Sequence, residues 1–337
     1  MSSRQSQLIR LFLRAQKLAQ RRATIESVRR MSRWSERIYS VPKDVRQEKI
    51  IQNERTYEWL IPKDVGSDKV IFYIHGGGFV FPLYNPTRYV AAYLARITGM
   101  RVFLADYRLA PEHPFPAAIE DCVTAYRWLI SKESVLPEQV VFVGESAGGN
   151  LVITTMLTLQ DAGDPLPSGA ASICPVFDFE GGGTFYVQDD PMVAADFVML
   201  QLNAYRGSAD PRNPRLSPLY ANLRGLPPLL IQIGASEILQ SGAEELALRA
   251  KQAGVPTILD TWPGMWHYWH MFVPFLPEAQ QAMQTINHFL HACTKQDSSE
   301  PFGDIGNTND QDMGETLFQE EVEPEKKTRL RRNIDAV

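Results

Sequence analysis

The hexapeptide Gly144-Glu145-Ser146-Ala147-Gly148-Gly149 is the feature that most restricts how this chain can fold. It follows the β-branched and aromatic run 140–143 and precedes an apolar helical pattern over 147–160. A serine on so sharp a strand-to-helix turn needs glycines around it, because side chains there would collide with neighbouring backbone. The context favours a nucleophile elbow over a plain turn, with a strained backbone that exposes the Ser146 hydroxyl. The N–H of Ala147, at the start of the helix, would be free to donate.

Short apolar runs alternate with helical patterns between residues 47 and 293, which is typical of a parallel sheet covered by helices. Continuous apolar runs predict strands buried on both faces at 70–74, 102–105, 140–143, 171–174, 229–233 and 257–260. An alternating stretch predicts an antiparallel edge hairpin at 48–61. Helices are predicted at 116–131, 147–160, 242–253 and 277–293. We expect one α/β domain.

The two ends of the chain differ in charge. Residues 1–46 hold 12 Lys and Arg against 3 Asp and Glu, whereas residues 294–337 hold 6 against 11. The basic end has apolar residues, among them Leu8, Leu11 and Phe12, at helical spacing. Such a helix either adsorbs to an anionic membrane or packs on the body with its basic face in water, and its narrow apolar stripe favours packing. The polar tail from 294 is expected to be disordered.

Composition argues against several classes of protein. The chain has 44% hydrophobic residues, 22% charged residues and a net charge of −5, so neither nucleic acid nor a metal is an expected partner. Cys122, Cys174 and Cys293 are too few and too scattered for a disulfide framework or a zinc site. No cofactor is expected. The N-terminus has no apolar run of about 20 residues, so we expect a cytoplasmic protein without stable membrane insertion.

A second glycine-rich element, His75-Gly76-Gly77-Gly78-Phe79, ends the predicted strand 70–74. Three consecutive glycines are entropically costly unless the backbone must closely approach another group. An oxyanion is such a group, and the N–H groups of Gly77, Gly78 and Ala147 would stabilise it by roughly 3–4 kcal/mol for one donor. A phosphate-binding loop would also need a Lys and a Ser or Thr, which are missing here. The element therefore predicts an oxyanion hole.

These two motifs, together with Asp106-Tyr107-Arg108-Leu109-Ala110-Pro111-Glu112-His113-Pro114-Phe115-Pro116-Ala117-Ala118, resemble the hormone-sensitive-lipase-like branch of the α/β hydrolases. This branch contains bacterial esterases that carry HGGG and GDSAGG. The resemblance covers residues 40–293, and Glu145 stands where the family usually has Asp. It implies the α/β-hydrolase fold, with a mostly parallel central sheet flanked by helices and a helical cap.

The resemblance also implies the domain organisation. The cap would consist of a basic helical segment, 1–46, and an insertion at about 180–224, placed around a catalytic domain, 47–293. The remaining tail, 294–337, would be charged and disordered. A homodimer formed through the exposed edge strand near 256–262 is compatible with this arrangement.

The catalytic base should follow the strand 257–260, because these enzymes carry their triad in the order serine, acid, histidine. His267 and His270 both satisfy that order. The segment Pro263-Gly264-Met265-Trp266-His267-Tyr268-Trp269 resembles the family's Gly-Met-x-His-x-Phe loop, which implies that His267 is the base.

The acid is implied by register with the family. The segment Gly234-Ala235-Ser236-Glu237-Ile238-Leu239 matches the family's Asp-Pro-Leu-type segment and places Glu237 at the acid position. A glutamate can accept the Nδ1–H of a histidine as an aspartate does. Asp178, after the strand 171–174, stays open as an alternative, because some lipases of this fold carry their acid there.

The implied function is a serine hydrolase that cleaves carboxylic esters of short to medium acyl chains through an acyl-enzyme. A lactone hydrolase is the close alternative, because the reaction is the same acyl transfer with the alcohol tethered to the acid. An amidase or deacetylase and a non-catalytic ligand receptor are weaker alternatives. Phe79, Tyr84 and Trp266 are predicted to contact a small hydrophobic ester or lactone, although core packing explains any one of them as well.

Overall fold

A central sheet of eight strands organises the computed structural model, which describes residues 3–20, 24–35, 39–52, 55–180 and 190–294. The strand order is β1-β2-β4-β3-β5-β6-β7-β8. The strands are β1 (Val45–Gln52), β2 (Arg55–Pro62), β3 (Val70–Ile74), β4 (Arg101–Ala105), β5 (Val140–Glu145), β6 (Gly169–Ile173), β7 (Leu229–Gly234) and β8 (Thr257–Trp262). β1 and β2 pair antiparallel, as do β2 and β4, and all other neighbours are parallel. The six predicted parallel strands and the predicted edge hairpin are confirmed, but the expected burial of 257–260 on both faces is wrong, because β8 ends the sheet and is half-buried along its whole length.

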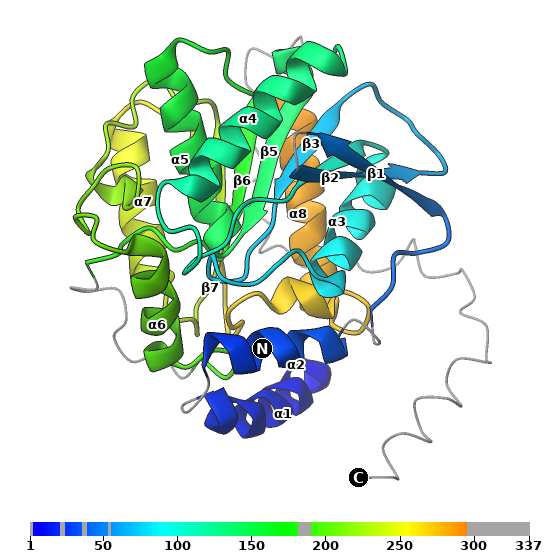
Figure 1. The fold of residues 1–337 in the computed structure, drawn as a ribbon. Helices are drawn as coiled ribbons and strands as arrows, with labels where there is room; N and C mark the ends of the chain where they lie inside the picture. The colour runs from blue at the N-terminus through cyan, green and yellow to red at the C-terminus, as the bar shows by residue number, and fades with distance from the viewer. Residues whose placement is uncertain (1–2, 21–23, 36–38, 53–54, 181–189, 295–337) are drawn as a thin grey trace. The chain divides into compact units, whose positions relative to one another are not determined.

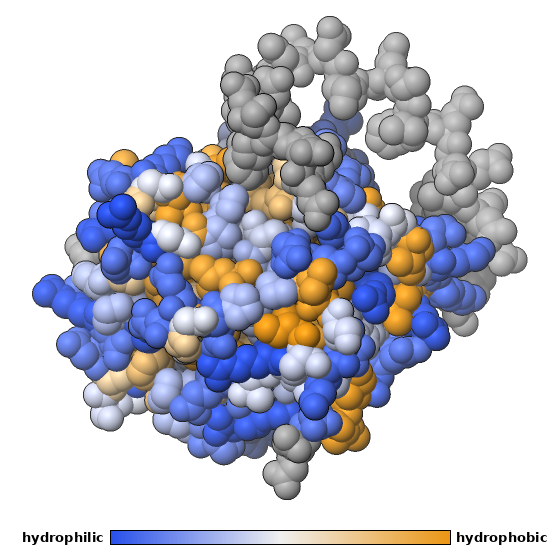
Figure 2. All heavy atoms as spheres, turned by 90° about the horizontal axis from the view of Figure 1, so that it is seen from above, coloured by the Kyte–Doolittle hydropathy of each residue, from blue (hydrophilic) through white to orange (hydrophobic). Residues whose placement is uncertain are grey.

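Helices cover both faces of this sheet (Figure 1). They are α1 (Arg4–Gln20), α2 (Ile25–Ser35), α3 (Asn85–Thr98), α4 (Ala117–Lys132), α5 (Ala147–Ala162), α6 (Ala195–Arg206), α7 (Gln240–Gln252) and α8 (Pro277–Cys293). Buried residues of α4, α5 and α7 share one core with residues such as Phe72 of β3, whereas those of α3 and α8 share the other core with Ile71 and Tyr73. The alternation of neighbouring residues on β3 therefore builds a core on each face. The face seen from above, opposite the side on which α1 and α2 lie in Figure 1, is mainly hydrophilic with separate apolar patches (Figure 2).

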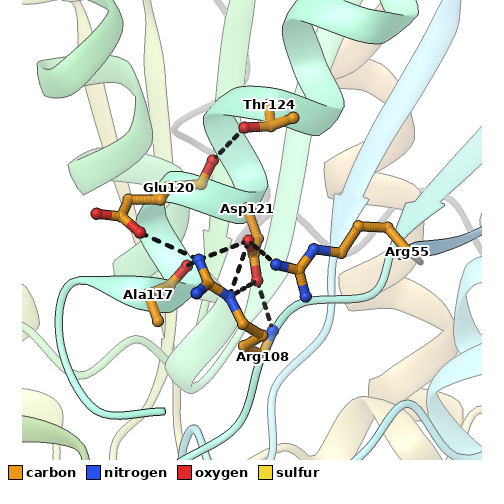
Figure 3. A network of polar contacts seen from close by, with 6 residues as sticks. All are labelled: Arg55, Arg108, Ala117, Glu120, Asp121 and Thr124. Carbon is orange, nitrogen blue, oxygen red and sulfur yellow. Dashed lines mark hydrogen bonds and ion pairs between the residues drawn. The ribbon is translucent and has the colours of Figure 1, made fainter. Parts of the chain in front are cut away.

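Asp121 of α4 joins segments that are far apart in the chain (Figure 3). Its nearly buried carboxylate accepts hydrogen bonds from Nε of Arg108 at 2.9 Å and from the Arg108 N–H at 2.8 Å. The same carboxylate lies 2.9 Å from the Arg55 guanidinium of β2, and Arg108 also bonds Glu120 at 3.0 Å. The network holds the segment between β4 and α4 in place. Residues 106–118 therefore have a structural role.

The helix predicted near the N-terminus is present as α1, but the face that it turns toward the body differs from the expectation. Leu8, Leu11 and Phe12 of the predicted apolar stripe are 69%, 64% and 60% exposed. The side facing the body instead carries Arg10 and Lys17, which donate to backbone carbonyl oxygens at 2.7 and 2.6 Å. The prediction that the basic face points into water is therefore wrong for Arg10 and Lys17, because these side chains donate to carbonyl oxygens of the loops that they cover.

Two further expectations concern the ends and the membrane. Except for residue 294, the tail expected to be disordered lies outside the described residues, as does part of the expected cap insertion, 181–189. Within the described part of the chain, no helix has both the length and the apolar character needed to cross a bilayer.

Candidate active site

Ser146 occupies the turn between β5 and α5 with φ 55° and ψ −115°, a strained combination for a residue with a side chain. A Cβ on Gly148 would lie 2.0 Å from the carbonyl oxygen of Ile74, and one on Gly144 would lie 2.5 Å from the carbonyl oxygen of Gly148. Both positions therefore require glycine. Ser146 stays partly exposed, while every other residue of the turn is buried. The geometry is that of a nucleophile elbow, as the sequence predicts.

His267 lies on the loop after β8, and its Nε2 is 3.0 Å from the Ser146 Oγ. The imidazole can therefore accept the serine proton directly. The other candidate, His270, is buried and lies 2.6 Å from Oε1 of Gln232 through its Nε2. Burial, followed by the charge of His267, lowers the pKa of His270 to about 3. His270 is thus held neutral within the core, and only His267 of this pair reaches the serine.

Glu237 is fully buried, and its Oε1 lies 3.7 Å from Nδ1 of His267. That separation is longer than a hydrogen bond, as catalytic pairs often are before substrate binds. Its second oxygen accepts the N–H of Gly234 at 3.2 Å, which orients the carboxylate. Asp178, the alternative acid, accepts the N–H of Glu180 at 2.8 Å in a local turn. The structure therefore brings Glu237 to the histidine.

Asp190 is a second buried carboxylate beside His267, and the sequence did not single it out. Its Oδ2 accepts the backbone N–H of His267 at 3.3 Å, and its Oδ1 accepts that of Met192 at 2.8 Å. Lys17 of α1 donates to its carbonyl oxygen at 2.6 Å. Asp190 comes from the predicted insertion, where neither a motif nor chain order points to it. Its one local signal is the proline that follows, which indicates a turn and no chemistry.

Opposing effects set the pKa of His267. Burial lowers it, whereas the facing Glu237 raises it, and the charges of Asp190 and Glu145 add to this increase. The net result is a pKa above the ordinary value for histidine. These carboxylates therefore favour the imidazolium form of His267.

Cys174, Glu237 and His267 are the one group of potential metal ligands found among the described residues, with ligand atoms within 4.8 Å of one another. Burial, followed by the charge of Glu237, raises the pKa of the Cys174 thiol well above its ordinary value. A metal would need the thiolate, together with the Nδ1 and carboxylate that face each other. The donor set therefore fits a histidine–carboxylate pair better than a metal site.

The glycine-rich loop, residues 75–79, lies next to the elbow and is held in place by Tyr107. The His75 ring stacks on Tyr107 at 4.1 Å, and the Tyr107 hydroxyl donates to the carbonyl oxygen of His75 at 2.9 Å. Gly77 and Gly78 have φ values of 99° and 60°, which favour glycine. A Cβ on Gly78 would also lie 2.4 Å from the nearly buried amide of Gln201 on α6. Gln201 is thus a second residue near the site that the sequence did not indicate.

The three residues predicted to contact substrate have different surroundings. Phe79 is fully buried and stacks on Tyr205 with ring centroids 3.9 Å apart. Trp266 is also fully buried, with its ring against Phe272. Tyr84 is half-buried. Burial favours a packing role for Phe79 and Trp266, so substrate contact by these residues stays a prediction.

A serine hydroxyl bonded to an imidazole, whose other nitrogen faces a buried carboxylate, defines a serine hydrolase when it stands at such an elbow. A family model described as alpha/beta hydrolase fold matches residues 71–271. An acetyl-hydrolase of Streptomyces hygroscopicus is 37% identical over 242 residues, which are 71% of this chain and 80% of that protein. An esterase of Acinetobacter venetianus is 33% identical over 211 residues, or 61% and 69% of the two chains.

A solved structure of an esterase supports the same family. The crystal structure of an esterase from the bacterial hormone-sensitive lipase family is 37% identical, with a TM-score of 0.82 over 88% of this chain and all of that one. This chain belongs to the alpha/beta hydrolase fold family. It is a carboxylic-ester hydrolase, and the resemblance drawn from its two glycine motifs is confirmed.

Proposed function

We propose that Ser146, His267 and Glu237 form the catalytic triad of this esterase. The observation that carries the proposal is the 3.0 Å contact between the Ser146 Oγ and the His267 Nε2 at the elbow. Nε2 takes the hydroxyl proton as Oγ attacks the ester carbonyl carbon, and Glu237 stabilises the imidazolium that results. The N–H groups of Gly77, Gly78 and Ala147 are proposed to hold the oxyanion.

The tetrahedral intermediate then collapses and breaks the bond between the acyl carbon and the alcohol oxygen. His267 returns its proton to the departing alcohol, which leaves an acyl group on Ser146. In the second half of the reaction, His267 removes a proton from water as the water oxygen attacks the acyl carbon. The bond between that carbon and the Ser146 Oγ then breaks, His267 returns the proton to Oγ, and the carboxylic acid is released. Every proton passes through one nitrogen, so a single histidine serves both half-reactions.

The proposed substrates are uncharged esters with short to medium acyl chains. This proposal draws on the name of the acetyl-hydrolase among the relatives and on a site whose histidine and acid are both buried. A panel of p-nitrophenyl esters of increasing acyl length, with a lactone of similar size, tests the preference. Turnover should fall from acetate and butyrate toward long chains, and Ser146→Ala should abolish both turnover and labelling by an organophosphate. Wild-type protein that neither turns over acetate nor is labelled would contradict the proposal.

The cap is proposed to consist of residues 1–46 and the insertion at about 180–224. Contacts from α2 support the first part, since Nε of Arg29 donates to the carbonyl oxygen of Val80 at 2.7 Å, next to the glycine-rich loop. The same guanidinium pairs with Glu112 at 2.7 Å. Arg29→Gln should therefore change KM for bulky esters more than for acetate, and equal changes for both would argue against a cap role.

A homodimer through β8 is also proposed. Among the residues that the structure describes, β8 ends the sheet and pairs with β7 alone, which leaves its outer edge as the place for a second strand. Sedimentation of the full chain tests the assembly. Thr257→Pro and Leu259→Pro, placed separately on the strand, should each weaken a dimer if that edge forms it, and a dimer that survives both excludes this interface.

A further inference from the structure

The outer face of α1 is apolar and exposed. Leu8, Leu11 and Phe12 lie three and four positions apart, so their side chains stand together on one side of the helix. Each is more than half exposed. Single exposed apolar residues are ordinary on protein surfaces, whereas three neighbours on one helix face form a patch that marks an interaction site.

Contacts on the opposite side fix this orientation of α1. Arg10 donates to the carbonyl oxygen of Gly264 at 2.7 Å, in the loop that carries His267. Lys17 donates to the carbonyl oxygen of Asp190 at 2.6 Å, and Leu13 is buried beneath the helix. Turning the apolar face inward would break both charged hydrogen bonds. The apolar face of α1 therefore stays outward as long as the helix is docked.

A shallow hollow adjoins the apolar face. It measures about 360 Å³ and is lined by Gln7, Arg10, Leu11 and Arg14. Two guanidinium groups and an amide around one hollow suit a phosphate group, because guanidinium donors match phosphate oxygens in pairs. An anionic headgroup can thus sit directly beside side chains that enter an apolar layer.

The charge of the N-terminal region indicates that the partner of α1 is anionic. Residues 1–46 carry 12 Lys and Arg against 3 Asp and Glu, although the whole chain has a net charge of −5. A basic helix with a compact apolar face is the pattern of helices that lie in the plane of a membrane interface. We propose that α1 docks this esterase on the surface of an anionic phospholipid bilayer. Leu8, Leu11 and Phe12 enter the boundary between headgroups and acyl chains, and the hollow holds a lipid phosphate.

Docking of this kind places the bilayer on the side of the molecule that carries the site. α1 bonds the loop of His267 through Gly264 and bonds Asp190, which in turn accepts the N–H of His267. Esters dissolved in the bilayer would therefore meet the enzyme at this side. Hydrolysis of water-soluble esters needs no membrane and should not depend on the outer face of α1.

Co-sedimentation of the full chain with vesicles tests the proposal. Wild-type protein should bind vesicles of phosphatidylcholine with phosphatidylglycerol, and bind pure phosphatidylcholine vesicles less. The variant Leu8→Ser, Leu11→Ser and Phe12→Ser should reduce partition to the anionic vesicles by about tenfold or more. Its hydrolysis of p-nitrophenyl acetate should equal that of the wild type, which shows that the variant is folded.

A matched control removes three apolar residues that are exposed elsewhere, through Ile51→Ser, Leu136→Ser and Leu248→Ser. This control should bind vesicles as the wild type does. The proposal is overturned if wild-type protein ignores anionic vesicles, or if the α1 variant and the control bind equally. Binding abolished by inorganic phosphate but unaffected by the α1 variant would mean a phosphate site without docking. An α1 variant that splits a wild-type oligomer, in protein that does not bind vesicles, would assign the face to a second copy.

Discussion

The substitution Asp190→Asn tests whether a charged carboxylate is buried beside His267. Asp190 has no solvent exposure and accepts two backbone N–H groups, one of them from His267. Burial raises its pKa, the charge of His267 opposes this, and that of Glu237 adds to it. The result is a pKa raised from 3.8 to about 6.

The expected size of the effect follows from that shift. A difference of about 2 pKa units corresponds to about 3 kcal/mol. Because the folded state holds the proton more tightly, Asp190 supports folding fully below pH 3.8, and this stability is lost as the pH rises through about 6. Asparagine has no such titration. At acidic pH the free energy of unfolding of the variant should be about 1 kcal/mol lower than that of the wild type, because its amide group replaces one acceptor. As the pH rises to 7.5 the wild type loses about 3 kcal/mol of stability that the variant keeps, so the variant gains that amount relative to the wild type.

Urea unfolding at pH 4 and at pH 7.5 measures this change. Asp196→Asn on α6 is the control, because its exposed side chain stays in water in both the folded and the unfolded state. A difference between wild type and Asp190→Asn that is the same at both pH values would refute the reasoning. Activity gives an independent readout. Loss of the Asp190 charge should lower the pKa of His267 and shift the acidic limb of kcat/KM to lower pH.

Three further substitutions test the site and its support. Glu237→Gln should lower kcat by about 10³–10⁴-fold, whereas Asp178→Asn should leave it nearly unchanged; the reverse ranking in p-nitrophenyl acetate assays would reassign the acid. Gly148→Ala should lower the free energy of unfolding by about 3 kcal/mol or more, because its Cβ meets a β3 carbonyl oxygen at 2.0 Å, while Gly66→Ala, in open space, should fold normally. Asp121→Ala should cost about 2–3 kcal/mol in urea unfolding by leaving two arginines without their shared carboxylate, and an unchanged midpoint would count against that network.

The sheet was predictable because strands buried on both faces must be apolar along their whole length. β3 and β5, which lead into the glycine-rich loop and the Ser146 turn, show this as unbroken buried runs. α3 was not predicted, and its buried face is made up largely of small residues such as Ala91, Ala92 and Ala95. Local patterns therefore revealed the strands and missed a helix whose small residues pack closely against the sheet.

The residues of the site also differ in how well local sequence patterns predict them. Ser146 and the glycines around it are recognisable because one local turn determines their residue types. His267 and Glu237 follow from chain order and from register with a family, although nothing in their neighbourhoods alone requires those roles. Asp190 and Gln201 reach the site from the insertion through tertiary packing. No local pattern encodes such contacts, so sequence reasoning could not find these two residues.

The orientation of α1 shows why periodicity can misplace a helix face. Hydrophobic periodicity assumes that the apolar stripe packs inward. Here the inner side forms two charge-assisted hydrogen bonds, each contributing about 1.5–3 kcal/mol, and buries Leu13. Burying an exposed Leu or Phe contributes a similar amount, about 1.5–3 kcal/mol. The competing terms are therefore close in size, and the fold keeps the polar contacts that brace the His267 loop. The free energy still available from Leu8, Leu11 and Phe12 can be gained only by a partner that covers them, and this reserve is what binding to a bilayer would use.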